Sequence, residues 1–292
     1  MVVAASAHAA AAVSLQDARG RHIELALPAE RIVALAPSIT ELVYAAGAGS
    51  RLIGVARHSD FPPAARALPT IGDASRVDFE HMLRLKPDLV LAWRSGNRVA
   101  DIERLERLGL RVFAIEPATL AAIPAALRDI GALAGSAESA ETAAVAFSDA
   151  ISALRARYAG RAPVRVFYEI WHRPLMTVNG RHIITDVLAV CGGRNVFANV
   201  RVLTPVVSVE AVLAARPQVV IGGSSSATAQ VFAGQWRGYG AYAALRNVPA
   251  LYVNPDEIQR HTPRIAAGTR SVCEHLDRVR DSAGAQGGAT GN

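Results

Sequence analysis

The sequence predicts an α/β protein of two similar parallel-sheet lobes, bridged by one long rigid helix, with a ligand cleft between the lobes. Three observations predict this fold class. The frame V-x-x-E-x-x-L-x-x-x-P-x-x-V occurs twice without a gap, in residues 77–93 and 207–223. Short apolar runs alternate with amphipathic segments in both halves, as in proteins with parallel sheets. One uninterrupted helical pattern, over residues 135–160, separates the halves.

Each copy of the frame predicts a short helix, a proline break and then a buried strand. Two further pairs of segments resemble each other in the same order, 40–47 with 185–192 and 108–115 with 245–253. A chance match is plausible for one pair but not for three in one order, so we infer an internal duplication. This two-unit repeat is distinct from a solenoid, which needs three or more units.

The strands of the first lobe are predicted from its apolar runs, and its first helix from a capping signal. Ser38 and Glu41 are spaced as in a capping box, which predicts that a helix begins at Ser38. The expected strands are residues 31–35, 52–56, 88–92 and 110–115, with an edge strand within 21–27 and the second lobe opening on 165–170. The expected domains are a leader (1–20), an N-terminal lobe (21–134), the bridging helix (135–160), a C-terminal lobe (161–280) and a disordered tail (281–292).

The bridging helix has its own signals. Ser136 is a good N-cap, and apolar residues recur at helical spacing along one face. About 23 residues at the α-helical rise give a rod of roughly 33 Å. A flexible linker would be rich in Gly and Ser. We therefore expect a stiff connection and little hinge closure. The apolar face is formed by Ala143, Phe147, Ile151, Leu154 and Tyr158.

Composition excludes several classes of protein. The chain has 292 residues, 51% apolar and 19% charged, so it is long enough for two cores and is not intrinsically disordered. The net charge of +6 comes from scattered arginines and a single lysine, Lys86, without the basic and aromatic stripe of a nucleic-acid interface. We expect no nucleic-acid partner. No apolar run reaches the length of a transmembrane helix.

The N-terminus predicts export. Residues 1–13 are almost all Ala and Val, and Ala7-His8-Ala9 resembles a signal cleavage site. Because a positive segment is lacking, we expect a signal peptide truncated at its start; the alternative is a disordered Ala-rich leader. The two cysteines, Cys191 and Cys273, are compatible with one disulfide in an exported chain or with two buried thiols.

No catalytic motif of a known hydrolase, protease or nucleotide-binding enzyme is present. The loop of residues 222–226 is Gly/Ser-rich and follows a strand, which suits an anion cradle, but a mobile loop is the favoured interpretation. His58, His172, His261 and Asp256 follow strands or lie in loops, and together they would suit a metal-dependent enzyme. Taken singly, each histidine is better explained as a surface or capping residue.

Two tryptophans end buried strands. Trp93, followed by Arg94, ends one strand of the first lobe, and Trp171 ends a strand of the second. An exposed indole at the mouth of a cleft suits a flat, partly apolar ligand, whereas the alternative is packing against the bridging helix. Glu80 and Glu210 occupy equivalent positions in the duplicated frame. The helix dipole alone also favours an acid there.

Four segments together resemble the helical-backbone metal receptors. These are periplasmic solute-binding proteins of ABC importers for cobalamin, haem and ferric siderophores, and the likeness is greatest to the cobalamin binders. It extends from Arg31 to about Val279. The segments that carry it are Ser59-Asp-Phe-Pro-Pro63, Leu85-Lys-Pro-Asp-Leu-Val-Leu-Ala-Trp-Arg-Ser-Gly-Asn97, Val190-Cys-Gly-Gly-Arg-Asn-Val-Phe197 and Pro263-Arg-Ile265.

The resemblance implies roles for particular residues. Glu80 and Glu210 match the acids that dock onto the membrane permease, one from each lobe. Cys191 and Cys273 match a disulfide pair, which would stabilise the fold by roughly 4 kcal/mol in the chain-entropy account. His58 matches an aromatic ligand contact. The second-lobe contact segment corresponds to Asp256, Glu257, Ile258, Gln259 and Arg260.

The pocket departs from the family pattern. His58, Ala74, Thr204 and Glu257 stand where cobalamin binders carry aromatic residues. Trp171 would replace part of the lost aromatic surface, and His58 would suit an axial ligand to cobalt or iron. The expectation is a monomeric periplasmic carrier of cobalamin, without enzymatic activity or a cofactor of its own. Haem and ferric siderophores are the alternative ligands.

Overall fold

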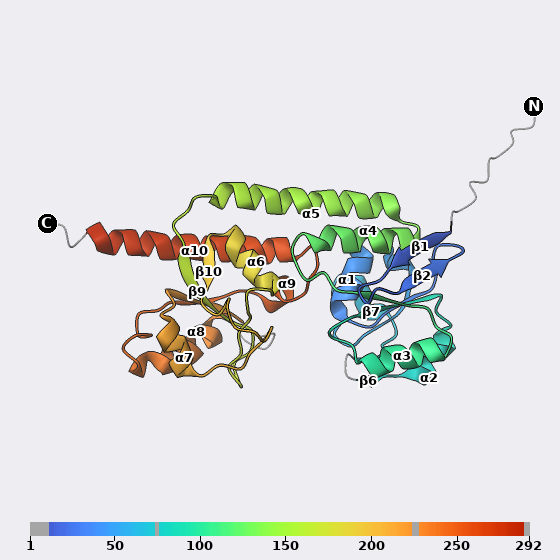
Figure 1. The fold of residues 1–292 in the computed structure, drawn as a ribbon, viewed down its shortest axis with the longest axis horizontal. Coiled ribbons are helices and arrows are strands. Elements are labelled where there is room, and N and C mark those ends of the chain that lie inside the picture. Colours follow the sequence, from blue (N-terminus) through green and yellow to red (C-terminus); the bar gives the residue numbers. More distant parts are fainter. Residues whose placement is uncertain (1–11, 74–75, 224–227, 289–292) are drawn as a thin grey trace, which may run out of the picture. The chain divides into compact units, whose positions relative to one another are not determined.

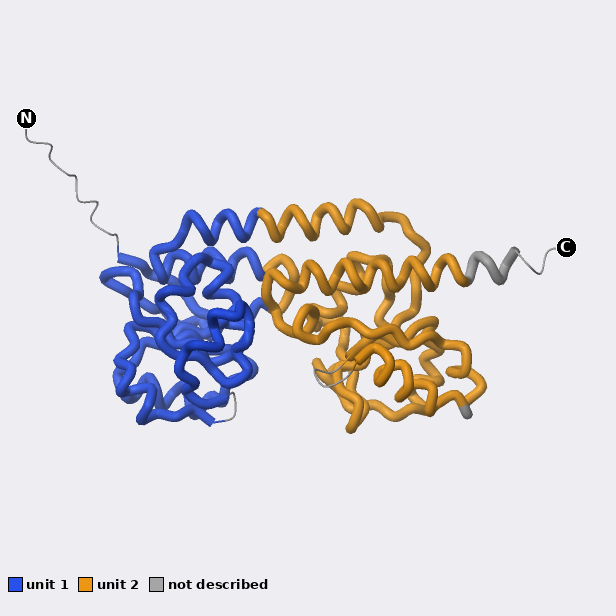
Figure 2. The backbone as a smooth tube through the Cα atoms, turned by 180° about the vertical axis from the view of Figure 1, so that it is seen from behind, with its two compact units in different colours: residues 1–117, 123–145 blue, residues 118–122, 146–292 orange. Residues whose placement is uncertain are grey.

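The computed structural model describes residues 12–73, 76–223 and 228–288 (Figure 1). The chain divides into two compact units, which we call unit 1 and unit 2 (Figure 2). Unit 1 comprises residues 1–117 and 123–145, and unit 2 comprises 118–122 and 146–292. The boundary lies inside helix α5 (Ala137–Tyr158), the helix expected over 135–160. In the described part of the chain, no helix is both long and apolar enough to cross a membrane.

Unit 1 is built on a four-stranded parallel sheet of order β4-β3-β7-β8. The strands are β3 (Ile32–Ala34), β4 (Leu52–Val55), β7 (Leu89–Trp93) and β8 (Val112–Ile115). The helices are α1 (Pro37–Ala45), α2 (Phe79–Leu85), α3 (Val99–Arg107) and α4 (Ala122–Ala134), with short 3-10 turns η1 (Gly49–Arg51) and η2 (Pro63–Ala67). Two hairpins complete it, β1 (Val13–Gln16) with β2 (His22–Leu25) and β5 (Gly72–Asp73) with β6 (Arg76–Val77).

Unit 2 repeats this architecture with a parallel sheet of order β10-β9-β11-β12. Helices α6 and α10 lie on one side of the sheet and α7 and α8 on the other (Figure 1). The strands are β9 (Val164–Glu169), β10 (Gly193–Asn195), β11 (Val219–Gly222) and β12 (Ala250–Tyr252). The helices are α6 (Ile183–Val190), α7 (Val209–Ala215), α8 (Ala229–Arg237), α9 (Pro255–Ile258) and α10 (Ile265–Gly288), with the 3-10 turn η3 (Gly238–Ala241).

The duplicated frame folds in the same way in both units. In α2 the Asp78 side chain accepts a hydrogen bond from the backbone N–H of His81, and in α7 Ser208 caps the helix in the same position. Both helices end on a residue in the left-handed region, Lys86 at φ 46° and Arg216 at φ 47°. The chain then enters the third strand of each sheet. The α/β fold class is confirmed, and the frame has the same local structure in both units, as the inferred duplication predicts.

An arginine just before or near the start of a central strand contacts the end of each frame helix, Arg31 before β3 and Arg165 within β9. The Arg31 side chain donates to the carbonyl oxygens of Leu85 and Lys86, and Arg165 donates to that of Arg216 at 2.9 Å. These contacts satisfy carbonyls that the helix leaves without an intrahelical partner. The arginine therefore belongs to the repeated unit, although it lies outside the frame.

Each sheet packs a separate apolar core against its frame helix. Met82 of α2 and Val212 of α7 occupy the same frame position, and both are fully buried. Met82 packs in one core with Val90 of β7, and Val212 packs in the other with Val220 of β11. The continuous apolar runs seen in the sequence are therefore strands covered on both faces, as expected for parallel sheets.

Several expected boundaries are wrong. Helix α1 begins at Pro37 with Ala36 as N-cap, because proline at N1 sets the start and Ser38 lies inside the helix. Residues 13–16 form β1, paired with β2, although they lie within the expected leader of residues 1–20. Helix α10 runs to Gly288, so residues 281–288 are helical, contrary to the expected disordered tail. The candidate cleavage site at residues 7–9 lies outside the described residues.

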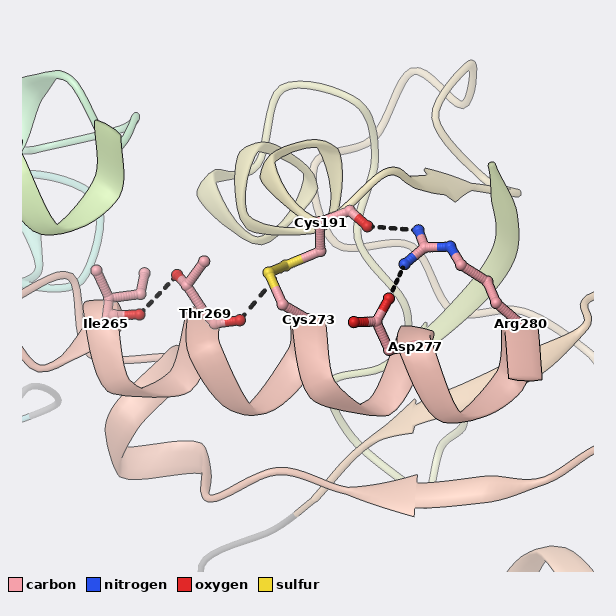
Figure 3. The surroundings of a disulfide bond; sticks show 6 residues. All are labelled: Cys191, Ile265, Thr269, Cys273, Asp277 and Arg280. Carbon is pink, nitrogen blue, oxygen red and sulfur yellow. Dashed lines mark hydrogen bonds and ion pairs between the residues drawn. A yellow bond between two sulfur atoms is a disulfide. The ribbon is translucent and has the colours of Figure 1, made fainter. Parts of the chain in front are cut away.

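Cys191 and Cys273 form a disulfide between the end of α6 and the middle of α10 (Figure 3). Their Cα atoms are 4.7 Å apart, and both residues are fully buried. Beside the disulfide, Arg280 of α10 donates to the carbonyl oxygens of Cys191 at 2.6 Å and Ala162 at 2.8 Å. The expected pairing is confirmed, and Arg280 is a second link between the same elements.

Candidate ligand-binding site

Both sheets have the topology that places ligand sites at the carboxyl ends of their central strands. In unit 1 the chain passes from β3 to β4 on one side and later to β7 on the other. In unit 2 it passes likewise from β9 to β10 and later to β11. Such a reversal of strand order opens a crevice beyond the carboxyl ends of the strands. The predicted residues Trp93 and Trp171 come at or just after these ends.

In unit 1, hydrogen bonds hold Trp93 in place. The half-buried indole donates from Nε1 to Ser95 Oγ at 3.0 Å. Ser95 donates in turn, from its backbone N–H and its hydroxyl, to the carboxylate of Glu116, both at 2.8 Å. The buried Asn97 side chain accepts from the Trp93 N–H and donates to the Leu35 carbonyl. A fixed aromatic face at this edge suits a rigid, flat ligand.

The other predicted ligand contacts of unit 1 are Arg94, His58 and Ala74. Arg94 is exposed. His58 is exposed after β4 and has a left-handed backbone, with φ 66°. That conformation is uncommon for a residue with a side chain and is found at functional positions. Ala74 lies outside the described residues.

In unit 2, Trp171 belongs to an exposed apolar row that the sequence did not reveal. Antiparallel bridges place Met176 opposite Trp171 and Val206 opposite Met176. Residues directly opposite each other point to the same face, so the three side chains form one row. Trp171 is 54% exposed and Val206 63% exposed, with Met176 half-buried between them. We call Trp171, Met176 and Val206 the apolar row.

The loop that carries Val206 adds further apolar surface. Its residues Val202 and Leu203 are exposed, and the predicted contact Thr204 is half-buried among them. The Thr177 and Asn179 N–H groups donate to the carbonyls of Pro205 and Leu203, at 3.1 and 2.9 Å. A sequence signal existed, the apolar run of residues 202–207, but its partner segment is about 30 positions away.

The predicted second-lobe contact segment spans α9 and the two residues after it. Asp256 pairs with Arg260 at 3.1 Å, and both side chains are partly accessible. Glu257 is half-buried, and the Gln259 amide donates to the Gly223 carbonyl at 3.4 Å. The side chain of Ile258 is fully buried, and its expected contact with a ligand stays a prediction. Two of the four residues of α9, Pro255 and Ile258, are buried.

Three residues of the expected metal site, His172, His261 and Asp256, each contact a different residue. His172 Nδ1 lies 3.2 Å from a carboxylate oxygen of Glu169. The His261 ring stacks edge-on against His182, with centroids 5.7 Å apart. Among residues 12–73, 76–223 and 228–288, no three His, Cys, Asp or Glu residues are grouped as metal ligands would be. The predicted loop of residues 222–226 lies mostly outside the described residues.

The matched glutamates are both exposed in the first turn of a capped helix. Glu80 has 84% of its side chain exposed and pairs with Arg84 at 2.7 Å. The pKa of Glu210 is lowered by hydrogen bonds from its own backbone N–H and from the Ser208 hydroxyl. Two carboxylates at equivalent positions of two units are a feature that a partner protein can recognise.

Comparison with known proteins gives consistent results. The sequence profile of the periplasmic binding protein family matches residues 32–248. A vitamin B12-binding protein of Vibrio cholerae is 35% identical over 250 residues, which cover 85% of this chain and 90% of that protein. A vitamin B12-binding protein of Yersinia pestis is 34% identical over 258 residues, covering 87% of this chain and 90% of that protein.

The solved structures agree. The periplasmic vitamin B12 binding protein BtuF of Vibrio cholerae superimposes with a TM-score of 0.79 at 34% identity, covering 87% of this chain and 98% of that one. The periplasmic heme binding protein HutB of the same organism gives a TM-score of 0.72 at 19% identity, covering 84% and 98%. The second likeness establishes a shared fold only.

Proposed function

This chain belongs to the periplasmic binding protein family, and from that premise we propose that it carries cobalamin to the permease of an ABC importer. Its relatives are binding proteins, and it is a binding protein rather than an enzyme. The observation that carries the choice of ligand is the 35% identity to a vitamin B12-binding protein over 85% of the chain. We place its action in the periplasm, as a monomer.

The chemistry of the site supports a large, flat and partly apolar ligand. Trp93 and the apolar row offer carbon surface at the carboxyl ends of the two sheets. Burial of apolar area supplies most of the binding free energy of such a ligand, and a few polar groups set its orientation. Asp256 and Arg260, already held by their mutual ion pair, are placed for that polar role, since organised polar groups lose little entropy on binding.

Haem is the second candidate, and the observation that favours it is His58. Its imidazole is exposed and follows a strand of unit 1, where a metal-centred ligand has access to it. A neutral imidazole is a common axial ligand to haem iron. Haem whose iron is bound by His58 would show a shift of its Soret band on binding, and His58→Ala would lose that shift.

A titration tests the choice of ligand. We expect cyanocobalamin to bind the purified protein with a stoichiometry of one, followed by tryptophan fluorescence and calorimetry, and haemin to produce no Soret shift. A Soret shift together with no response to cyanocobalamin would assign the protein to haem. Trp171→Ala should weaken cyanocobalamin binding roughly tenfold, the loss of about 1.4 kcal/mol expected for an aromatic contact. Tyr242→Ala, at an exposed aromatic side chain outside the proposed site, is the matched control.

Glu80 and Glu210 are the proposed contacts with the permease. Both are exposed and charged, and two charges on separate units specify one register on a partner. We expect Glu80→Ala combined with Glu210→Ala to abolish cobalamin uptake by cells, with unchanged ligand affinity of the purified protein. Glu138→Ala, at an exposed first-turn acid of α5, is the control and should transport normally. Weaker ligand binding in the double variant would place the glutamates in the binding site instead.

A further inference from the structure

Glu169 is a buried carboxylate at the ligand-facing end of the second sheet. It is the last residue of β9 and only 3% exposed. Its Oε2 accepts a hydrogen bond from Trp236 Nε1 at 2.5 Å, and its Oε1 lies 3.2 Å from His172 Nδ1. Burial raises the pKa of Glu169, and the neighbouring His172 and Trp236 act in the opposite direction. Removing one partner of such a buried contact leaves the other without compensation, which is costly.

The surroundings of this carboxylate are otherwise aromatic. The Trp236 ring packs edge-on against Phe167 at 5.5 Å and is tilted against Tyr239 at 5.2 Å. The Tyr239 ring in turn lies 6.4 Å from that of His172. An apolar side chain would fill such a place without the cost of desolvating a charge. The core therefore does not require an acid at Glu169, and the role of the carboxylate lies in holding its two partners.

His172 depends on the same carboxylate. Its side chain is largely buried, and among the described residues Nδ1 has no hydrogen bond of good geometry, which leaves Glu169 as the charge that it faces. Trp171 lies between the two residues in the chain, with its indole exposed. The turn closes through Ile170 N–H to the Met176 carbonyl at 3.0 Å and Met176 N–H to the Trp171 carbonyl at 2.8 Å.

We propose that Glu169 and His172 are positioning residues that fix the exposed indole of Trp171 and, with it, the apolar row. Strand β9 holds the backbone before Trp171, and the Glu169–His172 contact holds it after. The exposed side chain then loses little freedom when a ligand stacks on it. The ligand affinity expected from this arrangement rests on the proposed function, but the fixed position of Trp171 does not.

The first test needs no ligand. In a Trp93→Phe background the remaining indoles are exposed Trp171 and buried Trp236, so iodide quenching reports Trp171. We expect Glu169→Leu to increase quenching and to lower the fluorescence anisotropy. Glu169→Gln, which keeps an acceptor oxygen for Trp236 and places a polar amide beside His172 Nδ1, should restore both values. Unchanged quenching and anisotropy in a folded Glu169→Leu protein would overturn the proposal.

Two further variants separate positioning from stability. His172→Phe removes the contact with Glu169 but keeps an aromatic ring, and it should also raise quenching by iodide. If Glu169→Leu does not fold, His172→Phe tests the proposal in its place. Asp17→Asn removes a buried acid of unit 1 that is paired with Arg19. We expect this control to lower the melting temperature without any change in quenching by iodide. A change as large as that in His172→Phe would mean that general loss of stability is the cause.

The second test measures affinity in the native background. Glu169→Leu and His172→Phe should raise the Kd for cyanocobalamin roughly tenfold, whereas Glu169→Gln should stay within about twofold. Unaltered Kd values in folded variants would show that the pair does not serve binding. If the unmodified protein does not bind cyanocobalamin, the proposed function fails, and the quenching experiment still decides the role of Glu169 and His172.

Discussion

His182 is a histidine that the fold keeps neutral. It is the N-cap of α6, where its Nδ1 accepts a hydrogen bond from the Ile184 N–H at 3.2 Å. Burial, with a smaller contribution from the nearby His261, lowers the pKa of His182 to about 4. An imidazole that accepts at Nδ1 cannot be protonated there without losing the cap. The imidazole of His182 therefore stays unprotonated in the folded protein at pH values where the unfolded chain binds a proton, just below about 6.5.

Acid should destabilise the protein through His182. Because the folded pKa of His182 lies below the unfolded value, protonation favours the unfolded state, and stability is lost as the pH falls from about 6.5 to about 4. Between pH 7 and pH 5 this group should account for a loss of about 2 kcal/mol. His182→Asn keeps a capping acceptor without a titrating group and should reduce the loss measured by urea unfolding. His22→Asn, at an exposed histidine, is the control. Equal pH dependence in all three proteins would contradict this account.

At the residue scale, the sequence predicted features that depend on local pattern but not those that depend on tertiary packing. Trp93 and Trp171 were predicted as ligand contacts because each comes at or just after the end of a buried run. Met176 and Val206, which complete the apolar row, were not predicted because their exposure depends on bridges between segments about 30 positions apart. The burial of Ile258 was not foreseen because the resemblance marks a segment and does not show which side chain enters the core. The disulfide was left open by composition alone, and only the resemblance paired the cysteines.

The secondary-structure elements were predicted better than their ends. All the expected strands of unit 1 are present, within a few residues of their predicted bounds. The errors occur where a terminus depends on a partner. Strand β1 exists by pairing with β2, and the Ala18 N–H after it donates to the Ala114 carbonyl of β8 at 2.9 Å. The short strand β1 directly follows an Ala-rich stretch, and its partner in the chain begins only at His22, so its pairing was not predicted.

Glycine should stabilise the left-handed residues that end α2 and α7. Lys86 and Arg216 are exposed L-residues in the left-handed region, a conformation that costs roughly 1 kcal/mol and that glycine adopts freely. We expect Lys86→Gly and Arg216→Gly each to stabilise the protein by about 0.5–1 kcal/mol in urea unfolding. Ala214→Gly, inside α7, should instead destabilise by about 1 kcal/mol. Destabilisation by all three glycines would show that the left-handed ends carry no strain.

At the scale of the whole molecule, the duplication was the feature that predicted the fold. Two copies of one frame require two sheets of the same order, and the structure has β4-β3-β7-β8 and β10-β9-β11-β12. The ligand was harder to predict, because it depends on a few loop side chains rather than on the repeat. His58 and Thr204 depart from the family pattern without altering either sheet.

A further prediction concerns the disulfide. It closes a loop within unit 2, with a sequence separation of 82 residues. In the chain-entropy account such a loop stabilises the folded state by roughly 4–5 kcal/mol. Reduction should lower the melting temperature, and hydrogen exchange should show the loss of protection in unit 2 while the sheet of unit 1 stays protected. Thiol labelling would verify the reduction. An unchanged melting temperature in fully reduced protein would remove the disulfide from the account of stability.

Arg280 has a consequence for the repair of that bond. Its guanidinium connects α10 to the last turn of α6 through the Cys191 carbonyl, by hydrogen bonds that do not involve sulfur (Figure 3). After reduction in a folded molecule, the two thiols would remain neighbours at a high effective concentration. Reoxidation would then rejoin the same pair within one chain, in preference to cross-linking two chains.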